Sequence, residues 1–191
     1  MSDARETLRE IQKAEEELMA ARKKVLQLRR SVPKDPVGEY AFGTVEGSAT
    51  LAEFFGEKSD LILIHNMGKS CPFCTLWADG LNGLEAHYSN RAAFAVASPD
   101  SVEIQQEFAA SRGWDFRMVS CAENTFIEDM GFRNQDGGAM PGVSAFSRDE
   151  AGVITRESAA NFGPGDDFCS TWHILDLLKD GPAGWIRKYS Y

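Results

Sequence analysis

The chain has 191 residues, of which 43% are hydrophobic and 26% are charged. This composition is typical of a globular domain with a buried core, and it excludes a disordered chain. The net charge of −9 argues against a nucleic-acid partner, because an acidic surface repels phosphate. No apolar run approaches the roughly 18 to 20 residues that cross a bilayer, so we expect no contact with a membrane.

The beginning of the chain is rich in charge and lacks the apolar segment of a secretory signal peptide. We therefore expect a reducing, cytoplasmic environment for the four cysteines, Cys71, Cys74, Cys121 and Cys169. In such an environment, two cysteines separated by two residues are more often catalytic or metal-binding than a structural disulfide.

Residues 4–30 are predicted to form one long helix, because they contain no Gly or Pro and are rich in good helix formers. Its apolar residues form a heptad stripe of Ile11, Ala14, Leu18, Ala21, Val25 and Leu28. An isolated helix of this size is marginal in water. We therefore expect it to pack on its own domain or to form the arm of a homodimer. The prolines that follow predict a division into an N-terminal helix, residues 1–31, and a domain over residues 32–191.

The rest of the chain alternates predicted strands and helices. Strands are predicted over residues 40–46, 61–64, 94–97 and 116–120. Helices are predicted over residues 50–55, 72–85, 100–111, 125–130 and 168–178. A predicted hairpin of residues 143–146 and 153–157 precedes the last helix. This order predicts an α/β fold in which helices flank a parallel sheet and the hairpin adds antiparallel strands.

The main chemical motif is the pair Cys71 and Cys74, which follows the apolar strand 61–64 and opens the helix 72–85. A cysteine beside a helix N-terminus meets unpaired N–H groups and the positive end of the helix dipole, and both stabilise a thiolate. Cys74 lies one turn further on, within disulfide reach. Pro72 fits the first helical position, where its missing N–H is not needed. The spacing predicts Cys71 as the nucleophile and Cys74 as the resolving thiol of a disulfide exchange.

Two other interpretations of this pair remain open, a zinc knuckle and a pair of inert thiols. Zinc needs four ligands, usually from a second CxxC or CxxH motif, and the sequence has none. We therefore expect no metal and no cofactor. The expected partners are a protein or small-molecule disulfide and a dithiol donor. Cys121 and Cys169 are interpreted as buried apolar residues, with a role as a further resolving thiol as the alternative.

Met140 and Pro141 directly precede the strand predicted over 143–146. In this order and context the chain resembles the thioredoxin-like superfamily. The resemblance implies that Pro141 is a cis-proline that lies against the redox pair. The alternative is an ordinary turn with a trans bond. We take Met140 and Pro141, together with Pro72 and Phe73 between the cysteines, as candidate substrate contacts. The Pro-Phe dipeptide is also similar to that of glutaredoxins.

Four longer stretches are similar to a family catalogued as domain of unknown function number 899: LAEFFGEKSDLILIHNM, CPFCTLWADGL, SRGWDFRMVS and MPGVSAFSRDEAG. Its members are described as thioredoxin-like predicted dithiol–disulfide oxidoreductases. The similarity covers about residues 50–185 and implies functional roles for Cys71, Cys74 and Pro141. The loop between His65 and Cys71 departs from the family pattern, because it is shorter.

Several residues near the motif are weaker candidates. His65 could shuttle a proton, because its unperturbed pKa is near 6.5, or it could make a structural hydrogen bond. Trp77 could shield the disulfide and contact substrate, or it could pack in the core. Asn66 and Lys69 flank the motif, and a cation at Lys69 would favour the thiolate of Cys71. The alternative is a solvated loop.

The sequence therefore predicts a thioredoxin-like domain with an added N-terminal long helix, acting as a cytoplasmic dithiol–disulfide oxidoreductase. Two rival functions remain. The first is a peroxiredoxin-like thiol peroxidase, because the helix SATLAEFFG resembles the segment that leads into the first buried strand of such chains. A peroxidatic site usually places a Thr and an Arg around its cysteine, and the sequence shows neither near Cys71. The second is a binding protein without turnover, which would interact through its N-terminal helix.

Overall fold

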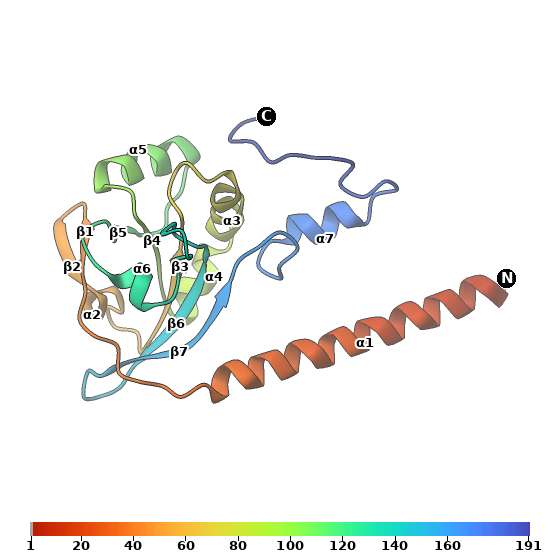
Figure 1. Ribbon diagram of the computed structural model, residues 1–191, viewed down its shortest axis with the longest axis horizontal. Coiled ribbons are helices and arrows are strands. Elements are labelled where there is room, and N and C mark those ends of the chain that lie inside the picture. The colour runs from red at the N-terminus through yellow and green to blue at the C-terminus, as the bar shows by residue number, and fades with distance from the viewer. Residues whose placement is uncertain (1) are drawn as a thin grey trace. The chain divides into compact units, whose positions relative to one another are not determined.

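The computed structural model describes residues 2–191 and divides into two units (Figure 1). The first unit ends at Lys34 and the second runs from Asp35 to Tyr191. The first unit consists mainly of helix α1, Ser2–Ser31, which matches the predicted long helix. The side chains of residues 4–28 are exposed.

The second unit is built on a mixed sheet in the order β2-β1-β5-β4-β3-β6-β7. The strands are β1 Ala41–Thr44, β2 Gly47–Thr50, β3 Asp60–His65, β4 Ala93–Ser98, β5 Met118–Ser120, β6 Gly142–Arg148 and β7 Ile154–Asn161. Strand β4 runs parallel to β3 and β5, whereas the other pairs are antiparallel. The predicted α/β fold, with a parallel centre and an antiparallel hairpin, is confirmed.

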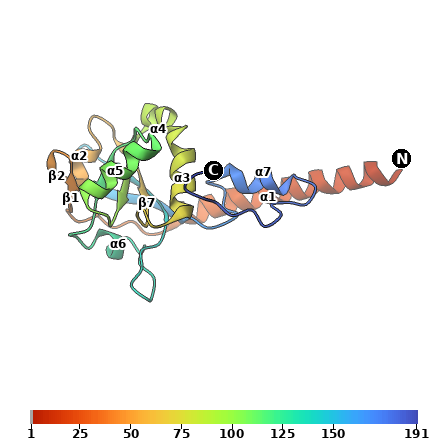
Figure 2. The same ribbon diagram turned by 90° about the horizontal axis from the view of Figure 1, so that it is seen from above.

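Helices cover both faces of this sheet (Figure 2). They are α2 Leu51–Phe54, α3 Pro72–Asn82, α4 Glu85–Arg91, α5 Val102–Arg112, α6 Phe126–Asp129 and α7 Ser170–Asp176. Side chains of α2 and α6 belong to one core, and side chains of α3, α4 and α5 belong to the other. Among the described residues, no helix combines the length and apolar character needed to cross a membrane.

Strand β3 carries side chains into both cores and leads directly to the cysteine pair. Leu61 and Leu63 pack in the core that contains α2, whereas Ile64 packs in the core that contains α3. This arrangement explains why the strand is a continuous apolar run, as is typical of a strand buried on both faces. The chain leaves β3 at its carboxyl end and enters α3 at Pro72.

Besides shifts in the bounds of several elements, the structure differs from the prediction in the following respects. Residues 47–50, where no strand was predicted and a helix was expected to begin at residue 50, form strand β2, because they pair with β1 as the second arm of a hairpin. The helix predicted over 72–85 ends at Asn82, and helix α4, which was not predicted, follows it. The helix predicted from residue 100 begins two residues later, because α5 takes Ser101 as its N-cap. Asp100 instead accepts a hydrogen bond from the backbone N–H of Lys69.

Candidate redox site

Cys71 is the N-cap residue of α3 and has an extended backbone, with φ −100° and ψ 104°. Its Sγ accepts a hydrogen bond from the backbone N–H of Cys74, with 3.1 Å between sulfur and nitrogen. The backbone N–H of Cys71 donates to the carbonyl of Gly68 at 3.1 Å. Pro72 occupies the first turn, where no N–H is needed. The local sequence thus places the sulfur beside the free N–H groups of the helix start.

The two thiols have opposite pKa shifts. A hydrogen bond from the Cys74 thiol is the largest cause that lowers the pKa of Cys71, from 9.0 to about 7. The backbone N–H groups of Cys74 and Phe73 and the charge of Arg187 act in the same direction, and burial opposes them. The same hydrogen bond and burial raise the pKa of Cys74. The pair is therefore set up to share one proton near neutral pH, held by Cys74.

Cys71 and Cys74 are both buried, with 7% and 2% of each residue accessible. The Cys74 sulfur also accepts a hydrogen bond from the backbone N–H of Met67 at 3.4 Å. A small cavity of about 10 Å³ borders Cys74, Trp77 and Pro141. The structure thus brings Pro141 into the surroundings of the pair, with room for roughly one water molecule.

The peptide bond between Met140 and Pro141 is trans, so the expectation of a cis-proline is wrong. The trans backbone is held on both sides of this bond. The backbone N–H of Met140 donates to the carbonyl of Phe132 at 2.7 Å, and the carbonyl of Pro141 accepts from Phe162 at 2.9 Å. The side chain of Met140 packs against the core on the α2 face. Pro141 therefore borders the candidate site, whereas the Met140 side chain does not.

His65 lies on the opposite face of the sheet from the cysteines. Its ring stacks on Phe132, with 3.7 Å between ring centroids, and on Phe126 at 5.5 Å. Its Nε2 shares a hydrogen bond with the Ser144 hydroxyl at 2.9 Å. Burial and the charge of Arg156 lower the pKa of His65 to about 3. The structure therefore places a neutral imidazole ring in the core on the α2 face, and His65 is also among the residues that line the small cavity beside Cys74.

The ring of Phe73, between the two cysteines, contacts a cationic side chain and two aromatic side chains. The Cζ of Arg187 lies 3.1 Å above the centroid of the Phe73 ring. Trp77 and Trp172 have ring centroids 6.0 Å and 6.1 Å from that of Phe73. Trp77 Nε1 donates to the Asp166 carboxylate at 3.4 Å. Trp77 is therefore a core residue that also borders the small cavity.

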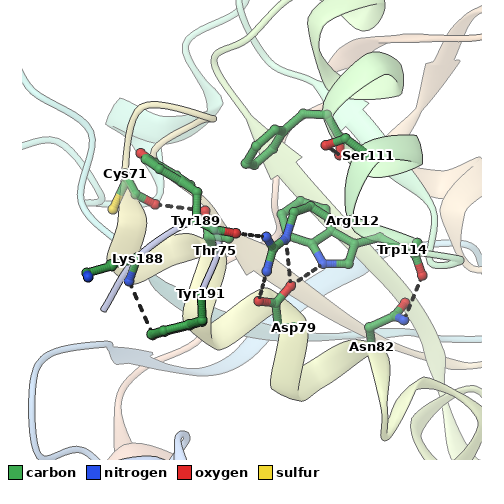
Figure 3. Close-up of polar contacts among 12 residues, drawn as sticks. Cys71, Thr75, Asp79, Asn82, Ser111, Arg112, Trp114, Lys188, Tyr189 and Tyr191 are labelled. Carbon is green, nitrogen blue, oxygen red and sulfur yellow. Dashed lines mark hydrogen bonds and ion pairs between the residues drawn. The ribbon is translucent and has the colours of Figure 1, made fainter. Parts of the chain in front are cut away.

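The C-terminal segment that supplies Arg187 is tied to α3 and α5 (Figure 3). Arg112 forms a two-pronged ion pair with Asp79 of α3 and also donates to the backbone carbonyl of Tyr189. Trp114 Nε1 donates to the same Asp79 at 2.9 Å. Burial raises the pKa of Tyr189, and the charges of the two cysteines add to this shift.

Of the two interpretations of Lys69, the structure supports the solvated loop, because the Lys69 side chain is exposed and its backbone N–H donates to the Asp100 carboxylate at 2.6 Å. Asn66 is buried, and its side-chain oxygen accepts from the backbone N–H of Gly68 at 2.8 Å, so it shapes the loop. The cation that acts on Cys71 is Arg187. No local pattern in the sequence could have found it, because the two residues meet only through the tertiary fold.

From the sequence, neither a Thr nor an Arg was expected near Cys71, and the structure differs from this expectation. The hydroxyl of Thr75, a buried residue, donates to the backbone carbonyl of Cys71 at 3.2 Å. Together with Arg187, this contact provides both residue types, although the hydroxyl bonds to the backbone and not to the sulfur.

The remaining cysteines lie in different cores. Cys121 packs on the α2 face of the sheet, and burial raises its pKa to about 12. Cys169 is buried in the same core as Cys71 and Cys74. Over residues 2–191, no group of three or more His, Cys, Asp or Glu side chains is arranged to hold a metal ion.

The fold and the CxxC pair at a helix start define a thioredoxin-like α/β protein. The family described as "Bacterial protein of unknown function (DUF899)" matches residues 2–188, so the chain belongs to this family. Comparison with curated protein sequences finds no match.

Three solved structures show the same fold. Peroxidoxin BcpB from Mycobacterium tuberculosis is 23% identical, with a TM-score of 0.53, over 66% of this chain and 83% of that chain. A mutant of PrxQ from Xylella fastidiosa is 17% identical, with a TM-score of 0.54, over 66% and 83%. Reduced Prx3 from Vibrio vulnificus is 14% identical, with a TM-score of 0.53, over 69% and 88%. At these identities the likeness concerns the fold alone.

Proposed function

We propose that this protein is a thiol–disulfide oxidoreductase in which Cys71 is the nucleophile and Cys74 the resolving thiol. The observation that carries the proposal is the hydrogen bond from the Cys74 backbone N–H to the Cys71 sulfur at 3.1 Å. The Cys74 thiol, together with this N–H group, lowers the pKa of Cys71 to about 7. A thiolate with a pKa near ambient pH combines a high charged fraction with good nucleophilicity.

The reaction consists of two exchanges. The Cys71 thiolate attacks one sulfur of a substrate disulfide, forms a mixed disulfide and expels the other sulfur as a thiolate. This step removes the negative charge from Cys71, and with it the charge that holds the proton on Cys74. Cys74 then loses its proton to the departing thiolate and attacks Cys71. The products are the reduced substrate and a Cys71–Cys74 disulfide, which an external dithiol reduces.

The expected reaction partners are a disulfide substrate and a dithiol donor, and the residues around the cysteine pair indicate which disulfides would bind best. Pro141 and Phe73 border the pair and offer apolar contact. The Arg187 guanidinium offers a positive charge. We propose that a disulfide with a carboxylate near its sulfur fits this combination better than a neutral one.

The test is turnover with dithiothreitol as donor and the disulfides of insulin as acceptor. The wild-type chain is expected to accelerate the reduction, and Cys71→Ser to abolish the acceleration. Cys74→Ser is expected to stop turnover and to accumulate a mixed disulfide at Cys71, visible by mass spectrometry. Cys121→Ala is the matched control, because Cys121 lies on the other face of the sheet. No acceleration by the wild-type chain, or full activity of Cys71→Ser, would refute the proposal.

A second candidate function, a thiol peroxidase, is favoured by the low exposure of Cys71, which is 7%. A small peroxide needs less room to reach this sulfur than a protein disulfide does. Two of the structures with the same fold are named as a peroxidoxin and as a Prx3 in complex with hydrogen peroxide. In this reaction the Cys71 thiolate would reduce the peroxide, giving a sulfenic acid and, after protonation, water. Cys74 would then condense with the sulfenic acid and release a second water.

Hydrogen peroxide consumption with the same donor separates the two functions. A peroxidase would consume peroxide faster than it reduces insulin, and Cys74→Ser would accumulate a sulfenic acid that dimedone traps at Cys71. An oxidoreductase would show the reverse preference. If neither substrate turned over, both proposed activities would fail, and a binding protein without turnover would be the candidate to test next.

A further inference from the structure

Helix α1, Ser2–Ser31, carries an apolar stripe that its own unit does not cover. The large residues of the stripe are all substantially exposed: Ile11 49%, Leu18 50%, Val25 44% and Leu28 57%. Contacts within the helix, such as the ion pair between Lys13 and Glu17 at 3.8 Å, stabilise its conformation but leave this stripe open. A heptad stripe of this kind is the surface by which helices pair.

The charges beside the stripe are sorted along the helix. In a heptad frame with Ile11 at position a, the charged residues at the flanking positions e and g are Glu10, Glu15, Glu17, Arg22, Lys24 and Arg29. The acidic residues thus come first and the basic residues last. Charges at e and g set partner choice and orientation in paired helices.

A parallel pair of two such helices would set each g residue against the e residue five positions later in the second copy. The resulting pairs are Glu10 with Glu15, Glu17 with Arg22 and Lys24 with Arg29. Two of these three contacts join like charges, so the parallel pair is disfavoured.

In an antiparallel pair the flanking charges attract rather than repel. With the stripes in contact, the facing residues are Ile11 with Leu28, Ala14 with Val25 and Leu18 with Ala21. Two of these three contacts put a larger side chain against an alanine, which favours close packing. In the same register Glu15 faces Arg22 and Glu17 faces Lys24 of the second copy, and each contact occurs twice by symmetry. Every ionic contact then joins opposite charges.

We propose that α1 pairs in antiparallel orientation with α1 of a second copy of this chain. The pairing buries the stripe and matches the flanking charges. Because the helices run in opposite directions, the two Ser31 ends lie roughly 35 Å apart along the pair at 1.5 Å per residue. Each copy then carries its own cysteine pair, and the redox reaction does not depend on the pairing.

The test is sedimentation velocity of the full chain over a range of concentrations in reducing buffer. The wild-type chain is expected to form a dimer. The variant Glu15→Arg with Glu17→Lys places like charges at every ionic contact, so its dissociation constant is expected to rise by about tenfold or more. The variant Arg22→Glu with Lys24→Glu is expected to dissociate equally, and a mixture of the two variants is expected to form a heterodimer.

A matched control tests the orientation. The control variant is Glu10→Lys with Arg29→Glu. In the antiparallel register these two residues face no charge. In a parallel pair the same substitutions would turn both repulsive contacts, Glu10 with Glu15 and Lys24 with Arg29, into attractive ones. We expect its dissociation constant to equal that of the wild type, and a several-fold tighter dimer would overturn the antiparallel assignment. A monomeric wild-type chain, with the helix packed on its own domain, would overturn the proposal. A dimer that persists unchanged in Glu15→Arg with Glu17→Lys would place the interface elsewhere and would overturn it too.

Discussion

The sulfur of Cys71 accepts a hydrogen bond from the backbone N–H of Cys74, with 3.1 Å between the two atoms. The thiol of Cys74 donates to the same sulfur. Cys74 therefore stabilises the Cys71 thiolate through both its backbone N–H and its side chain. The consequence is a division of roles. Cys71 is charged and nucleophilic near neutral pH, while Cys74 keeps its proton until Cys71 has reacted.

The alkylation rate of Cys71 is predicted to follow a titration near pH 7. The thiolate fraction of a group with a pKa of about 7 rises roughly tenfold between pH 6 and pH 8 and then levels off. Iodoacetamide labelling at a series of pH values, with the labelled residue located by mass spectrometry, measures this directly. A rate that keeps rising up to pH 9 or 10 would show an ordinary thiol.

Replacing Arg187 is predicted to raise the pKa of Cys71. Arg187→Met removes the positive charge near the sulfur and retains much of the apolar contact with Phe73. We expect the midpoint of the alkylation profile to move to higher pH and the rate at pH 7 to fall by about two- to fivefold. Lys69→Met is the matched control, because the Lys69 side chain is exposed, and it should leave the midpoint unchanged. Arg187→Lys should restore part of the shift.

Acidification is predicted to destabilise the fold through His65. Its pKa is lowered to about 3 in the folded protein, against about 6.5 in the unfolded chain. Between these values the unfolded chain binds the extra proton, so stability is lost as the pH falls from about 6.5 towards 3. Between pH 7 and pH 5 this single group accounts for about 2 kcal/mol.

Urea unfolding at pH 7 and at pH 5 measures this effect. The variant His65→Phe keeps an aromatic ring between Phe126 and Phe132 but has no group to protonate. Its stability should therefore change less between the two pH values, even if it is less stable at both. Equal pH dependence of the two proteins would assign the acid sensitivity to other groups.

Two glycines are predicted to respond in opposite directions to alanine. A Cβ on Gly142 would lie 2.3 Å from Phe132 Cε1 and 2.4 Å from the Ala160 carbonyl oxygen. Gly142→Ala should therefore destabilise the fold by about 1–3 kcal/mol or more. Gly80 lies inside α3 with no neighbour near its missing Cβ, so Gly80→Ala should stabilise by roughly 0.5–1 kcal/mol. Thermal unfolding of the two variants would show opposite shifts of Tm, and a tolerated Gly142→Ala would contradict the close packing.

The parts of the site that the sequence predicts are those that local structure determines. Cys71, Pro72 and Cys74 follow a buried strand and open a helix, so their relation to each other depends on a few neighbouring residues. The α/β fold was predicted for the same reason, because periodicity distinguishes strands from helices. The N-terminal helix was equally clear, because it lacks Gly and Pro over its whole length.

The parts that the sequence could not predict depend on contacts between distant segments. Arg187 reaches Cys71 only because the C-terminal segment is tied to α3 and α5 through Arg112. The sequence could not show which face of the sheet the His65 side chain lies on. Strand β3 is apolar on both faces, so it has no alternation of polar and apolar residues that would assign a face to each side chain. The trans bond before Pro141 is the ordinary state of an X–Pro bond, and the expectation of a cis bond came from the resemblance to the thioredoxin-like superfamily rather than from the local sequence.

The most direct test of the redox account is a titration of the purified chain against glutathione buffers, followed by alkylation and mass spectrometry of each cysteine. Cys71 and Cys74 are predicted to interconvert with a disulfide at a potential between about −120 and −270 mV, the range of known exchange proteins. Cys121 should stay reduced throughout. If Cys71 and Cys74 never close into a disulfide, or if Cys71 resists alkylation at neutral pH in the native state, the assignment of this pair as a redox centre is wrong.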